Sequence, residues 1–184
     1  QSVLYEVCGY DCCSTCSSIS IGQFMYTSVN NTASSKNYVN YSSIAHCMND
    51  FSGSWFTFCL YYGKICCPSV NSSINKCDYR SGIFCSPFCD SNSVTCSLTH
   101  SSFADNSAIS HACIRFESSG AKCEIKSCNI LRNKQGDLGS FGTIFTRVNL
   151  EIKDSCILEN KADYIFYQEY TSYTITLSNC TVDK

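Results

Sequence analysis

The chain has 184 residues, which corresponds to about one domain and is long enough to bury a hydrophobic core. Its 13 Lys plus Arg and 15 Asp plus Glu residues give a net charge of -2, and the basic residues are scattered, which argues against nucleic acid as a partner. With 44 % hydrophobic residues and 17 Cys, the composition excludes a disordered chain and indicates a folded, cysteine-rich domain.

Residues 1–16 are rich in cysteine and lack the charged and apolar regions of a signal peptide. We expect them to form a disulfide-tied, Cys-rich cap within a single domain that spans residues 1–184. Zinc is a less favoured alternative, because only Cys13 and Cys16 have the C-x2-C spacing of structural sites. The other candidate ligands are Cys8, Cys12, Cys66 and Cys67. No metal or cofactor is assigned.

The longest uncharged stretch, residues 12–35, is rich in Ser, Thr and Asn, so no membrane span is predicted. The number of cysteines is odd, so at least one is unpaired within the chain. Sequons for N-glycosylation occur at Asn30, Asn40, Asn71 and Asn179.

A repeat of 24 to 30 residues runs through the chain and is clearest in EIKSCNILRNK (124–134) and EIKDSCILENK (151–161). Each unit has an apolar anchor, a small residue three positions later and, in nearly every unit, a second apolar residue five positions later. The anchors are assigned to Ile19, Ile44, Ile74, Leu98, Ile125, Ile152 and Leu177.

Residues before the later anchors alternate between apolar and polar, which is typical of a half-buried β-strand. The three-residue step from anchor to small residue breaks this alternation, so a bend is expected there. Eight positions after their anchors stand Asn106, Asn133 and Asn160. Asparagine tolerates left-handed geometry, and its amide can hydrogen-bond to the same amide one unit away. Further β-rich runs occupy residues 55–62, 112–116, 142–148 and 163–170.

Stacked units of this kind predict an all-β parallel solenoid, in which each unit buries its faces against the next. Charges would then alternate in sign along one column. That column is Asp105, Arg132, Glu159 and Lys184.

Two pairs of cysteines are also expected to share columns, Cys96 with Cys123 and Cys47 with Cys77. Stacked Cβ atoms about 4.8 Å apart are too distant for a disulfide, so these four are predicted to be packed thiols. Any bridges are expected among the other cysteines of the N-terminal half.

The repeat strings, together with SLTHSSFADNSA (97–108) and TLSNCTVD (176–183), resemble the right-handed parallel β-helix, or pectin-lyase-like, superfamily. Within it, the chain is similar to Cys-rich surface proteins of parasitic protists and to bacterial polymorphic outer-membrane proteins. The resemblance implies a right-handed parallel β-helix of about seven coils. The leucine-rich repeat is the competing fold, but the β-branched and aromatic residues in the second half of each unit argue against it.

Three functions are considered. The Ser-, Asn- and Tyr-rich composition favours a non-enzymatic adhesion domain that binds a host-cell protein or glycan. A polysaccharide lyase or glycosidase on the same fold is the alternative, but the paired-carboxylate strings of such enzymes are missing. His46 and His100 are assigned to one column with Lys76 between them, too far apart for a catalytic pair, so no catalytic residue is named. A small disulfide-rich effector is the third interpretation.

We expect a secreted or cell-surface location, as in the resembled family. Because the last unit ends directly after its bend, the chain is expected to continue beyond Lys184 to a membrane anchor. An open coil end would instead favour self-association.

Overall fold

The computed structural model describes residues 2–5, 8–10, 24–47, 56–79, 81–109, 113–136 and 141–183. In these ranges the chain forms 23 strands that pair in parallel, and no helix occurs. No helix able to span a membrane is therefore found among the residues described. The strands wind into a parallel β-solenoid, which confirms the predicted fold class and excludes the leucine-rich repeat.

The strands form four sheets. Sheet A contains β1 (Ser2–Tyr5), β4 (Lys36–Asn40), β7 (Lys64–Pro68), β11 (Val94–Thr99), β15 (Lys122–Lys126), β19 (Asn149–Lys153) and β22 (Ile175–Ser178). Sheet B contains β2 (Cys8–Tyr10), β5 (Ser43–Ala45), β8 (Asn71–Ser73), β12 (Ser102–Ala104), β16 (Asn129–Leu131), β20 (Cys156–Leu158) and β23 (Thr181–Val182). Sheet C contains β9 (Lys76–Cys77), β13 (Ser107–Ala108) and β17 (Lys134–Gln135). Sheet D contains β3 (Met25–Ser28), β6 (Phe58–Tyr61), β10 (Ile83–Ser86), β14 (Ile114–Phe116), β18 (Ile144–Thr146) and β21 (Phe166–Gln168).

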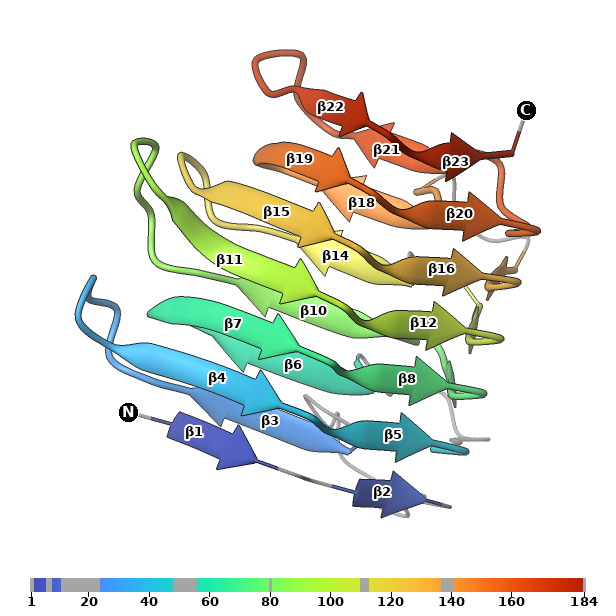
Figure 1. Ribbon diagram of the computed structural model, residues 1–184, viewed down its shortest axis with the longest axis horizontal. Coiled ribbons are helices and arrows are strands. Elements are labelled where there is room, and N and C mark those ends of the chain that lie inside the picture. Colours follow the sequence, from blue (N-terminus) through green and yellow to red (C-terminus); the bar gives the residue numbers. More distant parts are fainter. Residues whose placement is uncertain are drawn as a thin grey trace.

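Each turn passes through sheet D, then sheet A, then sheet B, and three turns add a short strand of sheet C (Figure 1). The chain climbs from β1 to β23 along sheets A and B in front and returns through sheet D behind, which is a right-handed winding. Sheets A and B have seven strands and sheet D has six, so the described residues make fewer complete turns than the predicted seven. The β-rich runs singled out in the sequence supply β6, β14, β18 and β21 of sheet D.

The anchors of the C-terminal half stack as predicted. Leu98 lies opposite Ile125, Ile125 opposite Ile152, and Ile152 opposite Leu177. The first three side chains are fully buried, whereas Leu177 is 46 % exposed because no strand follows β22 in sheet A among the described residues. Ile19 lies outside those residues.

The other two N-terminal anchor assignments are wrong. Ile44 belongs to sheet B, in the column of Phe103, and Ile74 lies at a corner with 42 % of its surface exposed. In sheet A the residue opposite Leu98 is Cys67. The repeat could not be aligned correctly here from the sequence, because a cysteine replaces the branched apolar residue and the connections differ in length.

Two columns of left-handed residues turn the chain at its corners. The column between sheets A and B has φ of 49° to 56° and contains Tyr41, Ser69, His100, Ser127, Asp154 and Asn179. The column after sheet B has φ of 52° to 59° and contains His46, Ile74, Asp105, Arg132 and Glu159. This geometry costs about 1–2 kcal/mol per non-glycine residue. The cost is offset by hydrogen bonds between levels, such as the one from His100 N to Lys126 O at 3.0 Å.

The predicted bend after each anchor is therefore confirmed, and at the second corner the left-handed residue is the one before each asparagine. Asp105, Arg132 and Glu159 adopt the left-handed conformation, and each immediately precedes one of those asparagines. The asparagine itself is free to turn its amide into the interior, where it hydrogen-bonds to the asparagines of neighbouring levels.

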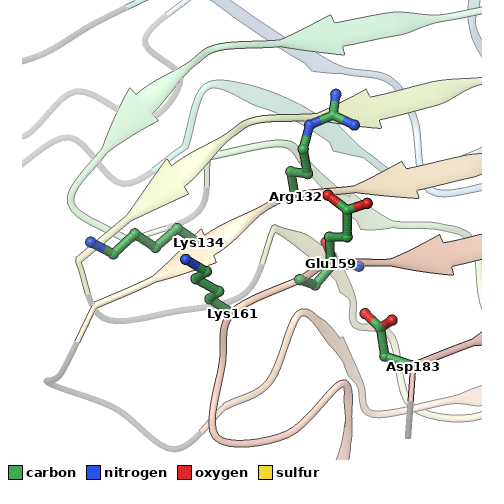
Figure 2. Close-up of a pocket in the computed structure, with 6 residues that line it drawn as sticks. Arg132, Lys134, Glu159, Lys161 and Asp183 are labelled. Carbon is green, nitrogen blue, oxygen red and sulfur yellow. The ribbon is translucent and has the colours of Figure 1, made fainter.

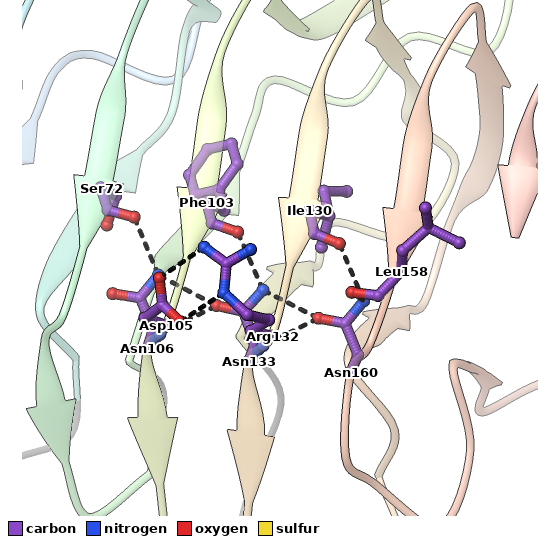
Figure 3. A network of polar contacts seen from close by, with 9 residues as sticks. All are labelled: Ser72, Phe103, Asp105, Asn106, Ile130, Arg132, Asn133, Leu158 and Asn160. Atoms are coloured by element: carbon purple, nitrogen blue, oxygen red, sulfur yellow. Dashed lines mark hydrogen bonds and ion pairs between the residues drawn. The ribbon is translucent and has the colours of Figure 1, made fainter. Parts of the chain in front are cut away.

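A ladder of buried amides runs along the stack (Figure 3). Asn106 Nδ2 donates to Asn133 Oδ1 at 3.1 Å, and Asn133 Nδ2 donates to Asn160 Oδ1 at 3.0 Å. Each Oδ1 also accepts the backbone N–H of the preceding asparagine, at 3.1 and 3.0 Å. The predicted amide ladder is confirmed, and Asn75, which donates to Asn106 Oδ1 at 3.0 Å, extends it by one level.

No cysteine in the described ranges forms a disulfide. Cys96 and Cys123 lie opposite each other and are fully buried, as expected for packed thiols. Cys47 and Cys77 are also buried and form no disulfide, but their shared column is wrong. Cys77 lies opposite Ala108, whereas the Cys47 backbone N–H donates to Asn75 Oδ1 at 2.9 Å, at the end of the amide ladder.

Burial raises the pKa of the Cys67, Cys113 and Cys123 thiols, and that of Cys128 to about 11. Thiols with raised pKa are poor nucleophiles. They serve the core as small hydrophobic side chains.

Of the predicted cap, residues 2–5 and 8–10 are described and form β1 and β2, the first strands of sheets A and B. Cys8 is exposed and free, and Cys12, Cys13 and Cys16 lie outside the described residues.

Candidate functional site

The histidines singled out in the sequence do not share a column. His100 lies in the corner column between sheets A and B, whereas His46 lies in the column after sheet B. Lys76 is in β9, where it lies opposite Ser107. The interpretation of these three residues as one column is wrong because it depended on the misassigned N-terminal anchors.

Of the candidate zinc ligands, Cys12, Cys13 and Cys16 lie outside the described residues, and Cys66 and Cys67 do not converge on one site. Cys66 and Cys67 are successive residues of β7, so their side chains point to opposite faces of sheet A. Cys67 is fully buried, and Cys66 is partly exposed. Across the residues that the structure describes, no three His, Cys, Asp or Glu side chains are grouped to hold a metal ion.

The outer face of sheet D carries a stack of aromatic rings and a guanidinium group. The Arg115 guanidinium lies 3.9 Å from the centre of the Phe145 ring, and the Phe145 ring stacks on Tyr167 at 5.5 Å. Arg115 Nε donates to Glu117 Oε1 at 2.6 Å. Arg115 is only 5 % exposed, and burial lowers its pKa. This stack is packed within the protein, so its cation is not available to a ligand.

Ion pairs continue along that face. Arg147 Nη1 lies 3.5 Å from Glu117 Oε1, and Arg147 Nη2 donates to Glu169 Oε1 at 2.9 Å. The hydrogen bonds from Arg147 hold the pKa of Glu169 below its usual value. A carboxylate fixed in this way suits an ion pair rather than a general acid.

The outer face of sheet A carries stacked carboxylates bridged by a lysine. Glu124 lies opposite Glu151, and Lys153 Nζ lies 3.7 Å and 2.9 Å from their respective Oε1 atoms. The bond to Lys153 lowers the pKa of Glu151. A groove of about 320 Å³ at the start of this face is lined by Ser91, Lys122, Asn149, Leu150, Glu151, Thr174 and Thr176.

The predicted column of alternating charges is confirmed for its first pair. Arg132 Nε and Nη2 each donate to an oxygen of Asp105 at 2.8 Å. This bidentate bond lowers the pKa of Asp105 and raises that of Arg132. Lys184, the last member of the column, lies outside the described residues.

A surface hollow follows this column, and we call it the corner cleft. It has a volume of about 730 Å³ and is lined by Arg132, Lys134, Glu159, Asn160, Lys161 and Asp183. Figure 2 shows the side chains of Lys134 and Lys161 at one end, with the Lys134 amino group pointing away from that of Lys161, and Glu159 and Asp183 toward the other end. The backbones of the two lysines form a parallel bridge, and both residues are exposed.

Neither Lys134 nor Lys161 has an ion-pair partner among the described residues. The sequence analysis did not single out this cleft, although the sequence carries a signal for it. Asn133-Lys134 and Asn160-Lys161 repeat after 27 residues, so each lysine directly follows a member of the amide ladder.

Comparisons with protein-family models, with curated proteins and with solved structures gave no match to this chain. The parallel β-solenoid fold is assigned from the strand pairing alone. Membership of the pectin-lyase-like superfamily and the likeness to protist surface proteins stay predictions.

Proposed function

We propose that this chain is a non-enzymatic binding domain of a secreted or cell-surface protein, and that it mediates adhesion to a host-cell protein or glycan. The corner cleft carries this proposal. Its lining contains two stacked lysines that have no ion-pair partner in the described chain. It also contains carboxylates that can accept hydrogen bonds from hydroxyl groups. This combination suits a polar ligand.

Four carboxyl groups that do not line the corner cleft are unsuited to act as the acid of a hydrolase. A glycosidase needs an acid whose pKa is raised, so that it can protonate the leaving group. Bonds to Ser93, Arg132, Lys153 and Arg147 instead lower the pKa of Asp90, Asp105, Glu151 and Glu169, respectively.

A carbohydrate-active enzyme on the same fold is the second candidate. Glu159 and Asp183 both line the corner cleft, and two carboxylates flanking a bound sugar are the catalytic groups of most glycosidases. The lysines at the other end of the cleft would then position an acidic substrate.

One pair of assays separates the two candidates. The purified chain is applied to cells and to a glycan array, and the same preparation is incubated with polysaccharides to measure reducing ends and unsaturated uronates. We expect saturable binding without turnover. Turnover that is lost in Glu159→Gln or Asp183→Asn would overturn the adhesion proposal, and so would the absence of binding to every cell and glycan tested.

A further inference from the structure

The backbones of Lys134 and Lys161 pair at adjacent levels of the stack, about 4.8 Å apart along its axis, so two like charges extend from neighbouring positions. Like charges directly opposite each other destabilise a sheet. No carboxylate among the described residues pairs with either lysine to offset this repulsion. The pair therefore concentrates positive charge at one end of a cleft, which is an arrangement that a bound anion stabilises.

The fold holds this pair in place. Lys134 N donates to Asn106 O and Lys161 N donates to Asn133 O, each at 2.8 Å. Each lysine also follows a ladder asparagine whose amide is hydrogen-bonded on the inner side of the chain. The backbone positions are thus fixed before any ligand arrives, which lowers the entropic cost of binding.

The type of cation indicates the type of anion. Arg132 is the guanidinium that could bind a planar carboxylate through two parallel bonds, and Asp105 already occupies both of those donors. Lysine ammonium groups are compact charges with three rotatable donors. Two of them at neighbouring positions suit a tetrahedral oxyanion with several acceptor oxygens better than a single carboxylate.

The position of the pair indicates a linear ligand. Lys76, Ser107, Lys134 and Lys161 form one column along the axis of the solenoid, and three of these four residues are basic. Glu159 and Asp183 line the same cleft and can accept hydrogen bonds from hydroxyl groups. Their negative charges oppose a uniformly anionic ligand and favour one that carries hydroxyl groups as well.

We propose that the corner cleft binds sulfate esters of a sulfated polysaccharide, with Lys134 and Lys161 as the anion-binding pair. This inference rests on the proposed binding function and specifies its ligand class.

The probes are a heparin hexasaccharide, the same oligosaccharide after complete desulfation, and a hexamer of galacturonate, each measured by calorimetry on the full chain. We expect the sulfated probe to bind and the other two to bind at least about tenfold more weakly. Raising the salt from 0.05 to 0.5 M shortens the screening length several-fold and should abolish most of the binding. Equal binding of the galacturonate hexamer would overturn the assignment to sulfate.

Lys134→Gln and Lys161→Gln should each weaken binding about threefold, and the double variant about tenfold. Lys126→Gln is the matched control, because Lys126 is an exposed lysine on the outer face of sheet A, away from the cleft. Unchanged affinity in the double variant would overturn the proposal. The thermal midpoint should stay the same or rise in the cleft variants, because a like-charge contact is removed. A falling midpoint would instead assign the lysines a structural role.

The two proposals fail in different ways. If the chain binds cells or other glycans but not the sulfated hexasaccharide, only the sulfate inference fails. If it binds nothing and degrades a polysaccharide, the proposed binding function fails with it.

Discussion

Replacing Asn133 by alanine removes the centre of the amide ladder and tests whether polar bonds hold the levels together. The Asn133 side chain donates to Phe103 O at 2.9 Å and to Asn160 Oδ1 at 3.0 Å. It accepts two bonds, both at 3.1 Å, from the backbone and side-chain nitrogens of Asn106. Alanine at this position leaves the Asn106 N–H and the Phe103 carbonyl without these partners in a buried site.

The expected loss follows from those two orphaned groups. Each buried polar group left without a partner costs about 1–3 kcal/mol. Bonds that keep a second partner, such as that of Asn106 Nδ2 with Ser72 O at 2.9 Å, add less. We therefore expect Asn133→Ala to lower the free energy of unfolding by about 3–5 kcal/mol. Asn160→Ala should cost less, because Asn160 is only partly buried.

Urea unfolding followed by circular dichroism measures this loss. Asn129→Ala is the matched control, because Asn129 is exposed on β16 and its substitution should change the free energy by less than about 0.5 kcal/mol. Hydrogen exchange at the Asn106 amide should accelerate in Asn133→Ala. Equal losses in Asn133→Ala and Asn129→Ala would refute the view that the ladder stabilises the stack.

Backbone strain, pH dependence and thiol accessibility provide independent tests. Ile74 has φ of 56° and is 42 % exposed, so Ile74→Asn should stabilise the protein by about 1 kcal/mol in urea unfolding, whereas a loss would contradict its place at a corner. Arg147 lowers the pKa of Glu169, so the stability from this pair is present above the ordinary glutamate pKa and is lost as pH falls through the lowered value. Glu169→Gln should remove that part of the acid transition, and an unchanged acid profile would argue against the pair. In native protein a maleimide should label exposed Cys89 quickly and Cys128 only after unfolding, as followed by peptide mass spectrometry; rapid native labelling of Cys128 would show that the interior is open.

The solenoid could be predicted where successive levels have the same length. Leu98, Ile125 and Ile152 are separated by 27 residues each, so the strand pattern, the bends and the ladder asparagines fall into register. Upstream, Cys67 takes the anchor position and lies 31 residues before Leu98. The longer connection breaks the 27-residue spacing, and the cysteine replaces the branched apolar residue of the anchor. The sequence pattern therefore points to Ile74 as the anchor instead.

The corner cleft depends on that same register. The spacing of Lys134 and Lys161 could have predicted their stacking, because both follow asparagines whose ladder was anticipated. The face of sheet D could not have been predicted. Its Arg115 and Phe145 come together only through the stacking of β14 on β18, after connections whose paths no pattern in the sequence specifies.

Methyl nuclear Overhauser effects in a sample labelled at Ile and Leu test the stacked register most directly. Successive levels should give cross-peaks from Ile125 to Ile152 and from Ile130 to Ile157, since these residues lie opposite one another in sheets A and B. Ile74 should give none to Leu98. Missing cross-peaks between the first two pairs, or a strong one between Ile74 and Leu98, would contradict the coil-on-coil winding described here.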